Sequence, residues 1–153
     1  MARYSASNHC VGESNWHFQF TPAYRRGIFA DPLVRELTIA YLAEAVQQLG
    51  MTLGAIDCGP DHIHLFLQNT RKVSVVQAVH KLKGYSSYKM RKGHWELFKQ
   101  QLYGEKFSSE GYFYQTVGTI TADTVKKYVA EGQTKHWEKT TSNKQKTIFN
   151  YAA

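Results

Sequence analysis

The segment HIHLFLQ, residues 62–68, constrains the fold most because its side chains divide cleanly between two faces. Successive side chains of a β-strand point to opposite sides of the sheet. One face would therefore carry Ile63, Leu65 and Leu67, and the other His62, His64, Phe66 and Gln68. The apolar stretch 51–58 and a Gly-Pro-Asp turn come directly before it, so the two segments together predict a β-hairpin.

The rest of the chain alternates strand and helix signals around this hairpin. Further strands are expected at 15–21 and 111–117, and helices from Asp31 to about Gly50, from Ser74 onward, and from Thr121 to about Thr134. The first 14 residues are small and polar and are expected to be a loose lead-in, and 93–111 is expected to be helix followed by loop. This order predicts an α+β, ferredoxin-like (RRM-like) sandwich: an antiparallel sheet, helices on one face and a C-terminal helix carrying Tyr128.

Composition narrows the class of partner. The chain has 153 residues and a formal net charge of +7, which favours a polyanion such as nucleic acid. No apolar run approaches the roughly 18 residues of a membrane span, and no signal peptide is recognisable. Two cysteines are too few for a disulfide framework, which predicts a cytoplasmic protein with reduced thiols. With DNA as its polyanion, such a protein is expected to be nucleoid-associated. We expect one domain over residues 1–138 and a basic tail over 139–153.

His62 and His64 are the first candidates for chemistry. They leave the same face of the predicted strand about 7 Å apart, so their imidazoles can converge on one metal ion. Seven histidines in the chain make a chance pair easy, and two solvated or hydrogen-bonded histidines are the plainer interpretation of this spacing alone. A metal site also needs a third ligand and an open position for substrate.

Several stretches resemble one family in the same order. GPDHIHLFL resembles the histidine–hydrophobe–histidine signature of the HUH endonucleases, specifically the single-tyrosine transposases of insertion sequences that move as single-stranded DNA. NHCVGESNWHFQFTPAYRRGIF, HKLKGYSSYKMRK, FSSEGYFYQTVG and VKKYVAEGQ resemble the opening strand, second helix, last strand and C-terminal helix of these transposases. The resemblance covers residues 8–133 and implies that Tyr128 is a nucleophile forming a 5′-phosphotyrosine. Lys126 and Lys127 would favour its phenolate.

The third metal ligand departs from the family pattern. Family members place a glutamine four residues after the tyrosine, where this chain has Gly132. On an ideal helix Glu131 lies roughly 60° from Tyr128 and Gln133 roughly 140° away, so spacing favours Glu131. A one-residue π-bulge would restore Gln133 to the position that the resemblance implies. The departure is also compatible with a weakened copy.

The family resemblance also bears on the identity of the metal. Two imidazoles alone favour Zn²⁺ or Mn²⁺, whereas the resemblance implies Mg²⁺ or Mn²⁺. Asp61, directly before the histidines, is a turn former that could also orient a histidine or act as a ligand.

Basic and aromatic residues supply the expected DNA-binding surface. The candidates for phosphate contacts are Arg25, Arg26, Lys81, Lys83, Lys89, Arg91 and Lys92, together with Lys126 and Lys127. Tyr24, Tyr85 and Tyr88 lie among them and could stack on bases. A solvated helix face explains each lysine equally well.

The resemblance further implies single-stranded DNA with subterminal hairpins as the partner. One nucleophilic tyrosine per chain and two element ends to cut imply a homodimer, and the resemblance implies that the tyrosine helix of one subunit can complete the histidine site of the other. Two alternatives stay open: a domesticated nickase acting on repetitive palindromes, and a non-catalytic domain that binds single-stranded nucleic acid through the aromatics of its sheet.

Overall fold

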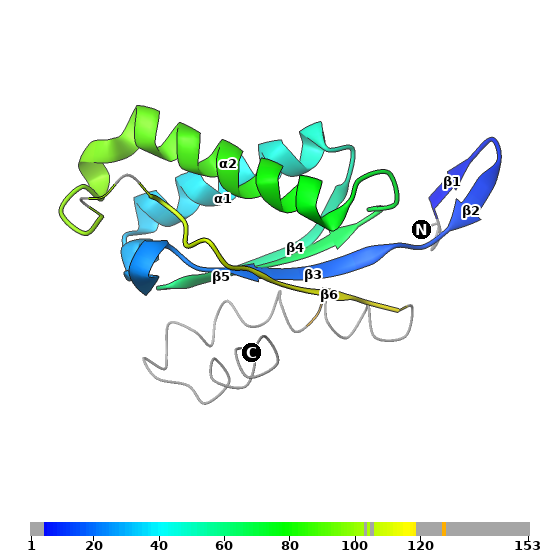
Figure 1. Cartoon of the computed structure of the whole chain (residues 1–153), viewed down its shortest axis with the longest axis horizontal. Coiled ribbons are helices and arrows are strands. Elements are labelled where there is room, and N and C mark those ends of the chain that lie inside the picture. The colour runs from blue at the N-terminus through cyan, green and yellow to red at the C-terminus, as the bar shows by residue number, and fades with distance from the viewer. Residues whose placement is uncertain (1–4, 103, 105, 119–126, 128–153) are drawn as a thin grey trace.

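The computed structural model describes residues 5–102, 104, 106–118 and 127, and a four-stranded sheet lies at its centre (Figure 1). The strands lie in the order β4-β5-β3-β6, and all three pairings are antiparallel. Their bounds are β3 Asn15–Phe20, β4 Thr52–Gly59, β5 His62–Gln68 and β6 Phe113–Thr116. With helix α1 after β3 and helix α2 after β5, this is the ferredoxin-like order that the sequence predicts.

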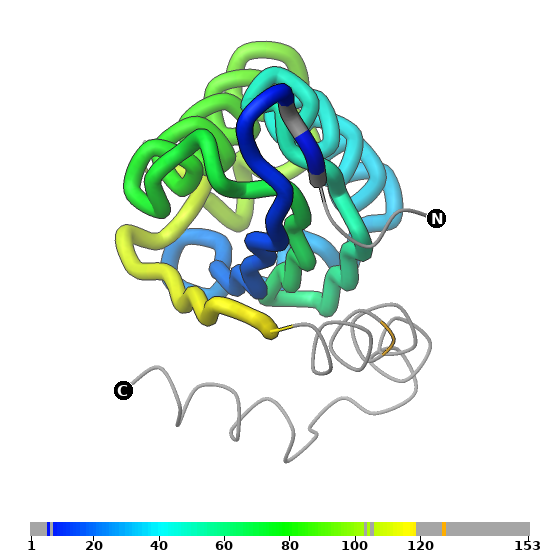
Figure 2. Tube along the Cα trace, turned by 90° about the vertical axis from the view of Figure 1, so that its right-hand side faces the viewer, coloured from blue at the N-terminus to red at the C-terminus, as the bar shows by residue number. Residues whose placement is uncertain are grey.

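Both long helices cover the same face of the sheet, side by side (Figures 1 and 2). Helix α1, Pro32–Gln48, begins where the Leu33 amide donates to Asp31 Oδ1 at 2.9 Å, and two residues after its end Gly50 has a left-handed φ of 72°. Helix α2, Val75–His94, begins at Ser74 with a reciprocal capping box. Short 3₁₀ turns lie at Ala23–Arg25 (η1), Ile28–Ala30 (η2) and Trp95–Leu97 (η3).

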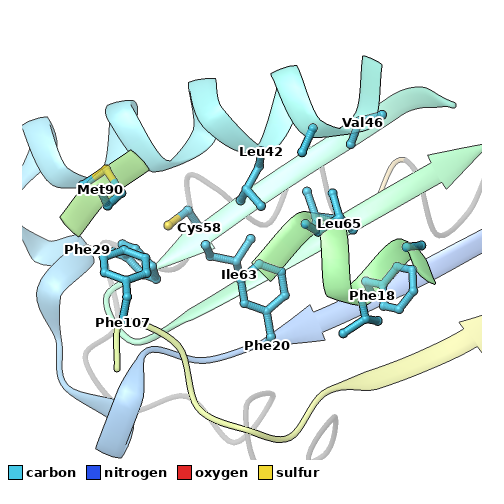
Figure 3. Packing of buried hydrophobic residues seen from close by; sticks show 14 of the residues in the cluster. Phe18, Phe20, Phe29, Leu42, Val46, Cys58, Ile63, Leu65, Met90 and Phe107 are labelled. Carbon is cyan, nitrogen blue, oxygen red and sulfur yellow. The ribbon is translucent and has the colours of Figure 1, made fainter. Parts of the chain in front are cut away.

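The hydrophobic core fills the space between the helices and the sheet (Figure 3). Phe18 from β3, Ile63 and Leu65 from β5, and Leu42 from α1 are all at most 1% exposed. Burying each such side chain stabilises the fold by roughly 1.5–3 kcal/mol. A slip of β5 by one residue would move its apolar side chains out of this core, so the core fixes which face the histidines occupy.

A β-bulge in β4 decides what lies beside those histidines. Leu53 pairs with Leu67, but the next pair is Ala55 with Phe66, so Gly54 is the extra residue. Beyond the bulge, the register places Asp57 opposite His64 and Gly59 opposite His62.

Two expectations about strands need correction. Residues 5–14 are not a loose lead-in, because β1 (Ser5–Ser7) and β2 (Cys10–Gly12) pair as an antiparallel hairpin. Strands of three residues carry no readable polarity pattern, since backbone hydrogen bonds rather than burial hold them. Strand β6 is shorter than predicted. Apart from Lys127, the predicted third helix lies outside the described residues, as does the tail 139–153. None of the helices that the structure describes has the length and apolar character of a membrane span.

The two cysteines should differ sharply in reactivity. Cys10 is exposed, whereas Cys58 is fully buried in the core, where burial and then the nearby Asp57 carboxylate raise the pKa of its thiol. Because the thiolate is the reactive form, we expect an aromatic disulfide reagent to label one thiol per chain in the native protein and two in guanidinium chloride. Rapid labelling of both thiols under native conditions would show that β4 is not packed as described.

Candidate active site

Strand β5 carries His62 and His64 on the face of the sheet turned away from α1 and α2. The predicted alternation is confirmed, since Ile63 and Leu65 lie in the core. The two imidazoles are 0% and 1% exposed, and their ring centroids are 5.0 Å apart with planes at 86°. Strand β5 has a hydrogen-bonded neighbour on each side, so both side chains start from a fixed backbone.

Asp61 orients His62 from the turn between β4 and β5. The His62 Nδ1–H lies 3.0 Å from Asp61 Oδ1 and donates to it, because a carboxylate can only accept. The other oxygen, Oδ2, is 3.4 Å from a guanidinium nitrogen of Arg25. With both oxygens engaged, the geometry favours the orienting role for Asp61 over the role of a ligand, and it places the His62 proton on Nδ1 so that Nε2 carries the lone pair.

His17 contacts the second histidine and was not among the sequence candidates. It lies on β3, where its Nε2 is 3.1 Å from Nδ1 of His64, and the two rings are nearly parallel at 15°. Burial lowers the pKa of His17 to about 4, so its imidazole is neutral at neutral pH. The signal that could have found it is the alternation in NWHFQF, which puts His17 and Gln19 on the face away from Trp16 and Phe18.

Two further buried polar residues border the histidines. Gln19 on β3 and Asp57 on β4 are both opposite His64 in the register, and each is 2% exposed. Among the residues that the structure describes, no hydrogen-bond partner reaches either polar atom of the Gln19 amide. This face of the sheet is therefore dry and polar, and a charge held there interacts more strongly than it would in water.

Gly59 forms a cradle for His62. A Cβ built on Gly59 would lie 2.2 Å from Cε1 of His62 and 2.7 Å from its Nδ1, closer than any real Cβ contact. The ring of His62 thus occupies the space that every other residue type would fill at position 59. The predicted turn Gly-Pro-Asp consequently contributes a packing surface as well as a change of direction.

The donor set suits a divalent cation. His62 donates from Nδ1 to Asp61, which is the arrangement by which proteins present Nε2 to a metal, and Nδ1 of His64 contacts Nε2 of His17. Within the described ranges, no group of three His, Cys, Asp or Glu side chains comes together for a metal. The predicted third ligands Gln133 and Glu131, the nucleophile Tyr128 and Lys126 lie outside the described residues, and Lys127 is exposed.

The η1 turn brings two predicted DNA-binding residues to the edge of this site. Tyr24 and Arg25 both have left-handed backbones, with φ of 56° and 51°, a conformation that costs a non-glycine residue on the order of 1 kcal/mol or more. The amide of Ala23, which donates to Phe107 at 2.9 Å, and the Arg25–Asp61 pair fix the turn. Tyr24 is consequently presented 80% exposed, as base stacking requires. Arg26 is exposed beside it.

The predicted contacts on α2 belong to the other layer of the molecule. Helix α2 packs on the face of the sheet opposite the histidines, so its cations do not converge on them (Figure 1). Lys81 and Lys89 lie over the ring of Tyr85, 4.9 and 5.5 Å from its centroid, and Lys92 lies over Tyr88. Arg91 lies over Trp95, and Lys83 donates to backbone carbonyls of Ser109 and Gly111.

Comparison with known proteins identifies a family that matches this chain. Residues 10–132 match the family described as "Transposase IS200 like". The transposases for insertion sequence element IS200 of Salmonella typhimurium and Salmonella typhi are each 30% identical over 114 residues, 74% of this chain and 74% of theirs.

Solved structures agree on the fold. A candidate transposase from Deinococcus radiodurans R1 matches with a TM-score of 0.66 and 26% identity, over 84% of this chain and 97% of that one. A REP-associated tyrosine transposase bound to a REP hairpin shares the fold at 11% identity and a TM-score of 0.56, over 86% of this chain and 74% of the other. Because the family match spans most of the sequence, β5 and its histidines included, the chain belongs to the IS200-like transposase family.

Proposed function

We propose that this transposase cleaves and rejoins single-stranded DNA at the ends of an insertion sequence through a covalent 5′-phosphotyrosine, with the help of a divalent cation. The observation that carries the proposal is the pair of buried histidines on β5, each with its Nδ1 engaged by a neighbour. Family membership supports DNA cleavage as the activity.

His62 and His64 would hold Mg²⁺ or Mn²⁺ through Nε2, with Gln133 as the proposed third ligand and Glu131 as its rival. When bound, such a cation neutralises charge on the scissile phosphate and on the departing oxygen. Carboxamide or carboxylate oxygen suits these hard cations better than a third imidazole.

Tyr128 would perform the displacement. Its phenol gives up its proton and its oxygen attacks phosphorus, forming the Tyr–O–P bond as the P–O3′ bond breaks and the 3′ oxygen takes up a proton. Because the phosphodiester is kept, a free 3′-OH can attack the phosphotyrosine and reverse the reaction without ATP. Lys127, which is exposed on the same segment, and Lys126 would stabilise the phenolate and attract the phosphate.

The η1 turn would receive the DNA beside this centre. Tyr24 is available for stacking on a base, and Arg26 for a phosphate contact. We propose that the substrate carries a hairpin near the cut and that two subunits act together, since each chain has one Tyr128 and an element has two ends. The REP-associated protein with the same fold was solved with a hairpin.

The test is cleavage of labelled single strands from the two flanks of the gene, with the matching duplexes as control substrates. We expect nicking and a covalent protein–DNA band with Mg²⁺ or Mn²⁺, their loss in EDTA, and a decrease of about 100-fold or more for His64→Ala. His80→Ala, on the exposed surface of α2, should behave as wild type. Binding without cleavage would instead identify a non-catalytic domain, and cutting in EDTA would exclude the metal.

A further inference from the structure

His17 and His64 form a buried pair that the proposed reaction does not itself require. The two side chains are 7% and 1% exposed, their ring centroids are 5.3 Å apart, and Nε2 of His17 is 3.1 Å from Nδ1 of His64. At this distance one nitrogen must carry the hydrogen and the other the lone pair. The direction of this hydrogen bond sets the tautomer of both rings.

The two directions have opposite consequences for metal binding. If His64 donates from Nδ1, its Nε2 carries a lone pair and can bind a cation. If His17 donates from Nε2, then Nδ1 of His64 is the acceptor, the proton of His64 lies on Nε2, and that nitrogen cannot be a ligand. Only the first direction lets His64 share a cation with Nε2 of His62, whose tautomer Asp61 already sets.

We propose that His17 is a positioning residue that accepts a hydrogen bond from Nδ1 of His64 and thereby holds His64 in the tautomer that binds metal. This inference rests on the proposed metal-assisted function. His17 on strand β3 would then accept from Nδ1 of His64, as Asp61 in the β4–β5 turn accepts from Nδ1 of His62.

The location of His17 in the sheet explains why its Nε2 atom lies within hydrogen-bond distance of Nδ1 of His64. In the register His17 is opposite Phe66, and Gln19 is opposite His64, so the contact runs diagonally across β3 and β5. Phe113 on β6 closes the other side of His17, with ring centroids 6.0 Å apart and planes at 74°. Packing between two strands limits the rotation of the His17 ring and keeps Nε2 directed at His64.

The experiment compares His17→Phe, which keeps a ring but removes the acceptor, with His17→Gln, which restores an acceptor oxygen. His80→Phe on the exposed face of α2 is the control. Nitrogen-15 NMR of the histidines in metal-free protein reads the tautomer of His64, and calorimetric titration with Mn²⁺ reads affinity. We expect the Nδ1–H tautomer in wild type, its loss in His17→Phe with Mn²⁺ affinity lowered about 10- to 100-fold, and substantial recovery in His17→Gln.

An Nε2–H tautomer of His64 in wild type would overturn the proposal, as would His17→Phe with unchanged tautomer and affinity. The nitrogen-15 spectrum of the wild-type protein tests the tautomer of His64 even if His17→Phe does not fold. Since the tautomer is read without metal or DNA, failure of the DNA-cleavage proposal would appear separately, as wild-type protein that shows the tautomer but does not cut.

Discussion

Tyr128→Phe should abolish both strand cleavage and the covalent protein–DNA band, lowering the rate by at least about 10³-fold. The substitution removes one oxygen, the atom that would form the bond to phosphorus, and keeps the aromatic ring. Binding of single-stranded DNA should change little, because charge and stacking contribute most of that affinity. The measurement is denaturing electrophoresis of end-labelled DNA together with a filter-binding titration.

Tyr114→Phe provides the matched control for loss of a phenol. Tyr114 lies on β6 opposite Phe18, so its side chain is on the face of the sheet away from His62 and His64, and it is 47% exposed. We expect cleavage by this variant at the wild-type rate. If Tyr128→Phe still forms the covalent band, another residue is the nucleophile.

Gly59→Ala should weaken Mn²⁺ binding at the proposed metal site through one added methyl group. The added Cβ would overlap the His62 ring, which is fully buried and hydrogen-bonded to Asp61, so the ring or strand β4 must move. We expect Mn²⁺ affinity to fall at least about 10-fold, as when a partner that orients a ligand is lost. Overpacking should also lower the free energy of unfolding by roughly 1–3 kcal/mol. Calorimetric titration and thermal unfolding measure the two effects.

Gly93→Ala is the corresponding control. Gly93 lies in the last turn of α2, where a methyl group added to it would have nothing within 4 Å, so the same chemical change meets open space. It should leave Mn²⁺ binding unchanged and raise stability by up to about 1 kcal/mol through helix propensity. Wild-type Mn²⁺ affinity in Gly59→Ala would show that Gly59 does not shape the position of His62.

Local signals predicted most of the fold. The Asp31 cap, Gly50 and the alternation of residues 62–68 each act within a few residues, and the structure confirms all three. The same alternation was sufficient to place His62 and His64 on one face. Short-range physical chemistry is readable from sequence because the interacting groups are neighbours along the chain.

The surroundings of the histidines depend on contacts that the sequence spacing does not reveal. His17 meets His64 across 47 residues, and Arg25 reaches Asp61 only because η1 takes a left-handed turn. Both arise from strand register and loop conformation, which simple periodicity does not encode. Arg25, expected as a phosphate contact, thus has a structural partner as well, a role that its charge alone could not indicate.

The bulge at Gly54 has a consequence for metal selectivity. If the same residues of β4 continued from Leu53 in regular pairing, Cys58 rather than Gly59 would lie opposite His62, and its side chain would leave the core. A thiol beside two imidazoles favours soft, tightly held ions such as Zn²⁺ over Mg²⁺. The extra residue Gly54 therefore keeps sulfur away from the histidines, and its position along β4 would favour Mg²⁺ or Mn²⁺ over Zn²⁺ at the proposed metal site.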